Sequence, residues 1–218
     1  MLKQLKSHGK KIIFVRHAES IGNARGLDDE SLVELPNHRF PITVPVGRNQ
    51  GRHCGGVLKS HRIFWDQAFY SSYLRPQETW QEITQVYNPC YLKPVMDPRL
   101  DEWWRGIWHT MSKADIARLY PLEGQIQKRE GWYHYRAPGG QSGPDVELQI
   151  RSFLNDYLYG CYRSFRQILI AGHGKWAILF WRLMTGASIE EAAERLKNNP
   201  FGNCSITIFD GTVREIVV

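Results

Sequence analysis

The stretch from Ile12 to Ser20 constrains the fold of this chain more than any other. It opens with the apolar, strand-favouring residues Ile-Ile-Phe-Val and ends abruptly at Arg16 and His17. In an α/β protein, side chains just past the C-terminal end of a buried strand point into the crevice where ligands bind. Arg16 offers a permanently charged fork that matches phosphate oxygens, and His17 offers a nitrogen nucleophile. On these residues alone, a strand ending in two solvated polar side chains is the alternative.

A second segment, residues 168–174, repeats the pattern of a short apolar strand, a histidine between glycines and an apolar helix. Two histidines, each ending a buried-looking strand, are better explained by convergence of His17 and His173 on one site. The two segments together resemble the histidine phosphatase superfamily, which includes phosphoglycerate mutases and acid phosphatases. Its signature, Arg-His-Gly/Ala-Glu-Ser followed three residues later by Asn, is matched from Arg16 to Asn23.

Two intermediate segments resemble the same family in the expected order. Residues 70–79, Tyr-Ser-Ser-Tyr-Leu-Arg-Pro-Gln-Glu-Thr, look like the segment that supplies a second phosphate-binding arginine, here Arg75. Residues 97–106 look like the Arg-Leu-x-Glu segment that carries a proton-transfer carboxylate. That spacing favours Glu102 over its neighbour Asp101. The resemblance thus runs from about residue 12 to residue 174, most of the chain.

The resemblance implies a role for each of these residues. His17 would attack phosphorus to give a phosphohistidine, and Glu102 would protonate the leaving oxygen before activating water. The phosphate oxygens would be bound by Arg16, Asn23, Arg75, His173 and the backbone N–H of Gly174. No metal or other cofactor is implied. Gln141 stands where many members carry Glu, and Lys175 where a neutral residue is more typical.

Four functions remain to be weighed. A phosphatase passes the phosphoryl group to water, whereas a phosphoglycerate mutase returns it to the substrate. Cofactor-dependent mutases usually continue the first motif with Trp-Asn and carry Glu-Arg-His-Tyr-Gly around the carboxylate. Residues 21–26 lack that Trp and residues 102–106 read Glu-Trp-Trp-Arg-Gly, which favours a metal-independent phosphatase of phosphomonoesters. A non-catalytic phosphate-binding module would have lost a core group, and none is lost. A two-histidine metalloenzyme lacks acidic ligands at suitable spacing.

The pattern of elements predicts a three-layer α/β/α fold with a mostly parallel central sheet, like that of phosphoglycerate mutase, in one domain over residues 1–218. The expected strands are Ile12–Val15, Gln67–Tyr70, Gln167–Ala171, Ser205–Phe209 and Val213–Val218. The expected helices are Arg48–Arg62, Pro76–Tyr87, Ser112–Tyr120, Pro144–Tyr159, Lys175–Thr185 and Ser188–Lys197. Asp210-Gly211 predicts a two-residue turn in a final antiparallel hairpin.

The composition of the chain limits which classes of binding partner are expected. The net charge of +6 comes from scattered basic residues without a nucleic-acid motif, so a site for anionic phosphorylated substrates explains it as well. No apolar run approaches the roughly 18 residues of a membrane span, and we expect a cytoplasmic protein without membrane attachment. Four widely spaced cysteines predict free thiols.

The substrate is expected to be a phosphorylated small molecule, with a phosphoprotein as alternative. Residues 27–46 and 103–139 should set specificity, and Trp103, Trp104 and Trp108 either wall the pocket or belong to the core.

Overall fold

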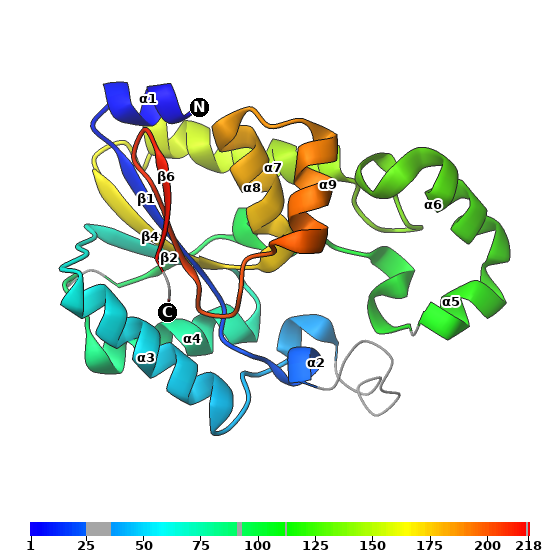
Figure 1. Ribbon diagram of the computed structural model, residues 1–218, viewed down its shortest axis with the longest axis horizontal. Helices are drawn as coiled ribbons and strands as arrows, with labels where there is room; N and C mark the ends of the chain where they lie inside the picture. Colours follow the sequence, from blue (N-terminus) through cyan, green and yellow to red (C-terminus); the bar gives the residue numbers. More distant parts are fainter. Residues whose placement is uncertain (25–35, 91–92, 112, 217) are drawn as a thin grey trace.

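A computed structural model describes residues 1–24, 36–90, 93–111, 113–216 and 218 of the chain, and its centre is a six-stranded sheet (Figure 1). The strands are β1 Lys11–Arg16, β2 Gln67–Tyr70, β3 Val95–Met96, β4 Gln167–Gly172, β5 Ile206–Phe209 and β6 Val213–Ile216. They lie in the order β3-β2-β4-β1-β5-β6. The first four are parallel to one another, whereas β5 and β6 are antiparallel. The predicted fold class is therefore confirmed.

Helices cover both faces of this sheet. They are α1 Leu2–Ser7, α2 Ile21–Ala24, α3 Val46–Ser60, α4 Leu74–Val86, α5 Lys113–Leu119, α6 Pro121–His134, α7 Gly143–Leu158, α8 Gly174–Thr185 and α9 Ile189–Asn198. Short 3-10 helices occur at Asn37–Arg39, Pro98–Leu100 and Gly106–Thr110. In Figure 1, α3 and α4 lie on one face and α7, α8 and α9 on the other, while α5 and α6 project to one side. Within the described residues, no helix combines the length and apolarity needed to cross a membrane.

Alternate residues of β1 are buried against opposite layers. Ile12 and Phe14 belong to the apolar cluster that α7 and α8 share, and Ile13 and Val15 belong to the cluster of α3 and α4. All four side chains are fully buried. A strand covered on both faces reads as a continuous apolar run, which is why Ile-Ile-Phe-Val is so informative. The sheet thereby holds the end of β1 in a rigid place.

The parallel pairing of β1 with β4 sets the position of the site. Its register places Arg16 opposite Gly172, so His17 and His173 follow their strands at the same edge of the sheet. His17 N–H donates to the Gly172 carbonyl oxygen at 2.9 Å. The carboxyl ends of two adjacent parallel strands therefore deliver both histidines to one place.

Several sequence-based boundaries were wrong or incomplete. Helices α3 and α4 each begin two residues earlier than predicted, at Val46 and Leu74, and Pro76 still lies in the first turn, where its missing N–H costs nothing. The final hairpin turns through three residues, 210–212, rather than two, because Phe209 pairs with Val213. Its last strand ends at Ile216. The strand was predicted to run to Val218, but Val218 is not in a strand. Residue 217, like residues 27–35 of the segment 27–46, falls outside the described residues.

Helices α1 and α6 and strand β3 were not anticipated. The apolar residues of α6 spread around the helix without forming a stripe, and Gly131 at φ 75° interrupts it. Strand β3 has two residues, too few to show alternation. As predicted, none of the four cysteines forms a disulfide: Cys54, Cys90 and Cys204 are buried and Cys161 is exposed.

The core position of Phe14 allows a first test. Its ring stacks on Trp176 at 5.8 Å between centroids and touches Phe201 edge-on at 5.9 Å. Phe14→Ala should lower the free energy of unfolding in urea by about 3–5 kcal/mol, because it removes buried area and leaves a cavity. Leu148→Ala, at a side chain that is 66% exposed on α7, is the control and should change stability by less than about 0.5 kcal/mol. Equal losses for the two variants would contradict this account of the core.

Candidate active site

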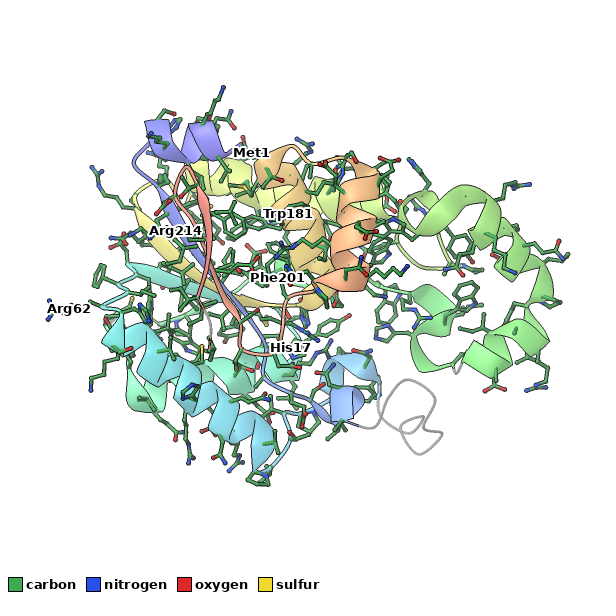
Figure 2. All side chains as sticks on the ribbon, viewed as in Figure 1. Met1, His17, Arg62, Trp181, Phe201 and Arg214 are labelled. Atoms are coloured by element: carbon green, nitrogen blue, oxygen red, sulfur yellow. The ribbon has the colours of Figure 1, made fainter. Side chains whose placement is uncertain are left out.

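His17, which is labelled in Figure 2, is held in one tautomer by the hydrogen-bond partners of its two ring nitrogens. The Arg75 guanidinium must donate, and its Nε lies 3.1 Å from His17 Nε2, so Nε2 is an acceptor without a proton. The proton then sits on Nδ1, which donates to the Ala18 carbonyl oxygen at 2.7 Å. Burial, followed by the charges of Arg75 and Arg16, lowers the pKa of His17 well below its ordinary value of 6.5. The ring is therefore a neutral imidazole with its lone pair on Nε2.

Arg75 and Arg16 bring positive charge to this nitrogen. Arg75 is 5% exposed, it lies over the Tyr73 ring at 4.9 Å, and burial lowers its pKa to about 10. Burial also lowers the pKa of Arg16, and its Nε is buried without a partner in the described part of the chain. Two desolvated guanidinium groups create a strong preference for an anion between them.

His173 lies behind His17, with the ring centroids 5.3 Å apart. It is fully buried, its Nε2 lies 2.7 Å from the Ser71 hydroxyl oxygen, and its Nδ1 has no partner among the described residues. Burial and the charge of Arg75 lower its pKa well below 6.5. Ser71 thus orients His173 and leaves Nδ1 for a further contact.

Glu102 and Asp101, the two candidates for the proton-transfer carboxylate, lie in different environments. Glu102 lines the cavity, where Oε1 accepts from Trp103 N–H at 3.0 Å and Trp176 N–H at 3.1 Å and Oε2 accepts from Lys175 N–H at 3.3 Å. Asp101 instead accepts from the backbone N–H and hydroxyl of Ser72, each at 2.7 Å. Asp101 therefore fixes the loop after β2, whereas the carboxylate that faces the cavity is that of Glu102.

Asn23 and Gly174 complete the set of residues singled out in the sequence. Asn23 Oδ1 accepts from the backbone N–H and the hydroxyl of Ser20, at 3.2 and 3.1 Å, so these two hydrogen bonds fix the orientation of the Asn23 side chain. Gly174 is the first residue of α8, and a Cβ there would meet Arg16 Nε at 3.2 Å. The absence of a side chain at Gly174 thus lets the guanidinium lie against the start of the helix.

A cavity of about 410 Å³ opens over these groups. Its lining includes all the predicted site residues except His173, which lies buried beside it: Arg16, His17, Asn23, Arg75, Glu102 and Gly174. Phe40, Leu196 and Phe201 provide apolar walls. Glu102 is the one carboxylate among the described lining residues, so the cavity is strongly cationic and suits a phosphate ester.

Four further residues at this site were not identified from the sequence. Arg105 and His109 line the cavity, and burial, then Arg75, lowers the pKa of His109 to about 4, so it is uncharged at neutral pH. The Asn37 carbonyl oxygen accepts from Arg75 Nη1 at 2.8 Å, and the Thr79 hydroxyl accepts from Ala18 N–H at 2.9 Å. Of the four, Arg105, in the Glu-Trp-Trp-Arg-Gly segment, and Thr79, at the end of segment 70–79, stood within recognisable motifs.

The three tryptophans divide between the two expected roles. Trp103 lines the cavity, Trp108 is 3% exposed and stacks on Tyr135, and the half-exposed Trp104 packs on His109. Gln141 has a local structural role, because its Oε1 accepts from Trp104 N–H at 3.0 Å. Nowhere in the described ranges do three His, Cys, Asp or Glu side chains gather as a metal site requires.

The lowered pKa of His173 makes stability depend on pH. Because the unfolded chain binds a proton near pH 6.5 and the folded chain resists it, the free energy of unfolding should fall as pH drops below about 6.5. His173→Gln should make this acid slope shallower by about 1 kcal/mol per pH unit in urea unfolding between about pH 7.5 and 5. The exposed His61→Gln is the control. An unchanged slope in His173→Gln would show that His173 protonates equally in both states.

Comparison with known proteins agrees with this geometry. The profile of the histidine phosphatase superfamily (branch 1) matches residues 12–218. The chain is 26% identical to the phosphoglycerate mutase-like protein AT74H of Arabidopsis thaliana, over 96% of this chain and 77% of that protein. It is 27% identical to a 2,3-bisphosphoglycerate-dependent phosphoglycerate mutase of Rhizobium etli, over 85% of this chain and 80% of that one.

Solved structures share the fold. The alpha-ribazole phosphatase of Shigella flexneri superposes with a TM-score of 0.74 at 18% identity, covering 95% of both chains. A mycobacterial glucosyl-3-phosphoglycerate phosphatase superposes with a TM-score of 0.70 at 18% identity, covering 95% of this chain and 98% of that one. The family profile, which spans nearly the whole chain, and the arrangement at the ends of β1 and β4 lead to one conclusion. The chain belongs to the histidine phosphatase superfamily, branch 1.

Proposed function

We propose that this protein hydrolyses phosphomonoesters through a phosphohistidine on His17, without a metal ion. The observation that carries the proposal is the tautomer of His17: Nδ1–H donates to Ala18, and Nε2 keeps a lone pair beside Arg75. A neutral, oriented nitrogen surrounded by guanidinium groups is what phosphoryl transfer from an anionic ester requires. The substrate in this proposal is a phosphorylated small molecule, and a phosphoprotein is the alternative.

In the first step, His17 Nε2 attacks phosphorus and the bond from phosphorus to the ester oxygen breaks. The Arg75 Nε–H group, which donates a hydrogen bond to Nε2 in the structure, then donates to a phosphoryl oxygen instead. Arg16 binds a second oxygen, and His173, with Nδ1 unpartnered, is placed to donate once it is protonated. The Ala18 carbonyl oxygen stabilises the charge that develops on the imidazole through its contact with Nδ1–H.

Glu102 supplies the proton that the leaving oxygen needs. Its carboxyl group is held in the cavity by three N–H donors near the start of α8 and in Trp103. In the second step the same carboxylate takes a proton from water, whose oxygen attacks phosphorus while the bond to His17 Nε2 breaks. The enzyme returns to its starting state with phosphate released.

A mutase is the second candidate, since the curated relatives include 2,3-bisphosphoglycerate-dependent phosphoglycerate mutases. It would return the phosphoryl group of the phosphohistidine to another hydroxyl of the substrate. The Glu-Trp-Trp-Arg-Gly segment and the missing Trp after the first motif favour water as the acceptor. Incubation with 3-phosphoglycerate separates the two functions, because a mutase yields 2-phosphoglycerate and a phosphatase yields inorganic phosphate.

The role of His17 can be tested by substitution and trapping. His17→Ala should reduce phosphatase activity by at least about a thousandfold, because no other described group offers a lone pair at that position. Quenching the parent enzyme with labelled substrate, in excess chelator, should leave acid-labile label on His17. His61→Ala, at an exposed histidine, should keep full activity. Label elsewhere, or activity that disappears in chelator and returns with one metal, would refute the mechanism.

The role of Glu102 can be tested through the leaving group. Glu102→Gln should slow hydrolysis of alkyl phosphates by about a hundred- to ten-thousandfold but activated aryl phosphates far less, because only an alkoxide needs a proton. Asp101→Asn is the matched control at the adjacent carboxylate and should leave the ratio of the two rates as in the parent, because Asp101 faces Ser72. An altered ratio in Asp101→Asn, with an unaltered one in Glu102→Gln, would assign the proton to Asp101.

A further inference from the structure

A second, smaller cavity of about 120 Å³ adjoins the phosphate cavity and shares four lining residues with it, Trp103, Arg105, Lys175 and Leu196. Its other walls include Trp108, Trp132 and Tyr135, which come from the segment carrying α5 and α6. We call this second cavity the aromatic annex. Because the annex adjoins the phosphate cavity, the alcohol part of a substrate whose phosphate lies in that cavity can extend into the annex.

The walls of the annex are aromatic faces. Trp108 and Tyr135 are stacked, with ring centroids 5.3 Å apart and planes at 22°, and Trp103 and Trp132 lie 5.9 Å apart at 46°. An apolar cavity of about 150 Å³ holds one benzene molecule, so the annex matches one small ring. Aromatic walls favour a flat ring, which stacks or packs edge-on against them.

The polar groups of the annex are mainly donors. Arg105 and Lys175 are cations, and among its described lining residues there is no carboxylate. Gln141 uses Oε1 for Trp104 N–H, which leaves its amide N–H groups. The indole N–H groups of Trp108 and Trp132 are buried with no partner in the described chain. A ring that bears acceptor atoms fits this environment, whereas each hydroxyl of a sugar ring would also bring a donor hydrogen, for which the described lining offers few acceptors.

Arg105 lies where the two cavities meet. Its guanidinium is half-buried, and it makes no hydrogen bond or ion pair with the residues described in the structure. A partly desolvated cation without a counter-charge favours an acceptor brought by a ligand. Arg105 therefore suits the oxygen atoms between the phosphate of a substrate and its ring.

We propose that the aromatic annex binds the alcohol part of the substrate through a single acceptor-bearing aromatic ring, with Arg105 binding the segment that joins ring and phosphate. This inference rests on the proposed function. It makes the preferred substrate class a phosphomonoester whose alcohol carries such a ring, as in a pyrimidine nucleoside monophosphate.

The test compares uridine 5′-monophosphate with ribose 5-phosphate, in which a hydroxyl replaces the pyrimidine ring. We expect kcat/KM to favour the nucleotide by about tenfold, the scale of one base stacking on an aromatic side chain. Trp132→Ala should bring that ratio close to one, with Trp132→Leu as the substitute if the alanine variant fails to fold. Trp181→Ala changes another half-buried tryptophan, which lines neither cavity and lies apart from His17 in Figure 2, and should keep the parent ratio.

A binding measurement separates this inference from the proposed function. Calorimetric titration of His17→Ala protein with both compounds should give the same preference for the nucleotide, and Trp132→Ala in that background should remove it. If neither compound is hydrolysed, the titration alone decides the annex, and the trapping experiment on His17 decides the proposed function. Equal affinities for the two compounds, or a ratio that Trp132→Ala does not change, would overturn the proposal.

Discussion

The parallel pairing of β1 with β4 is the interaction on which the site depends. Residues 12–15 are fully buried on both faces of the sheet, so a shift in register would expose or bury the wrong side chains. With Arg16 opposite Gly172, the two histidines leave adjacent strands together, and the start of α8 lies against Arg16. The reactive geometry is therefore a consequence of core packing and needs few contacts of its own.

That geometry concentrates positive charge where water is excluded. Arg75 is nearly fully buried, and His17 and His173 are kept neutral by burial and by the guanidinium groups around them. Glu102 is the one described carboxylate of the cavity wall and offsets only part of this charge. In the proposed function, a bound phosphate would supply the missing negative charge, so that the unfavourable desolvation of the arginines is offset by affinity for phosphate and by stabilisation of the transferring group.

The sequence predicted the sheet, and the convergence of His17 and His173 at one of its edges, well, because both depend on buried strands. Ile-Ile-Phe-Val and Ile-Leu-Ile-Ala carry an apolar signal that only two-sided burial explains, and the histidines follow them directly. The helix boundaries were predicted less accurately. Tyr73, the residue before α4, makes no side-chain hydrogen bond that caps the helix, so the sequence carries no capping signal at that start. Strand β3 has two residues and cannot be recognised from alternation.

The segment around α6 was beyond sequence reasoning for a different physical reason. Its aromatic residues do not repeat at helical spacing, and they divide between two clusters. Tyr133 belongs to the main core, whereas Trp108 and Tyr135 form a small cluster of their own with Ile116 and Ala137. The sequence could not show that these residues line a cavity, because that depends on how the fold places them beside Arg105 and the phosphate cavity. In the proposed mechanism, residues 103–111 and 113–141 would supply walls next to the leaving group, whereas the ends of β1 and β4 and the start of α4 would supply the reacting groups. Substitutions in that stretch can alter which alcohol is accepted without disturbing the pairing that positions His17.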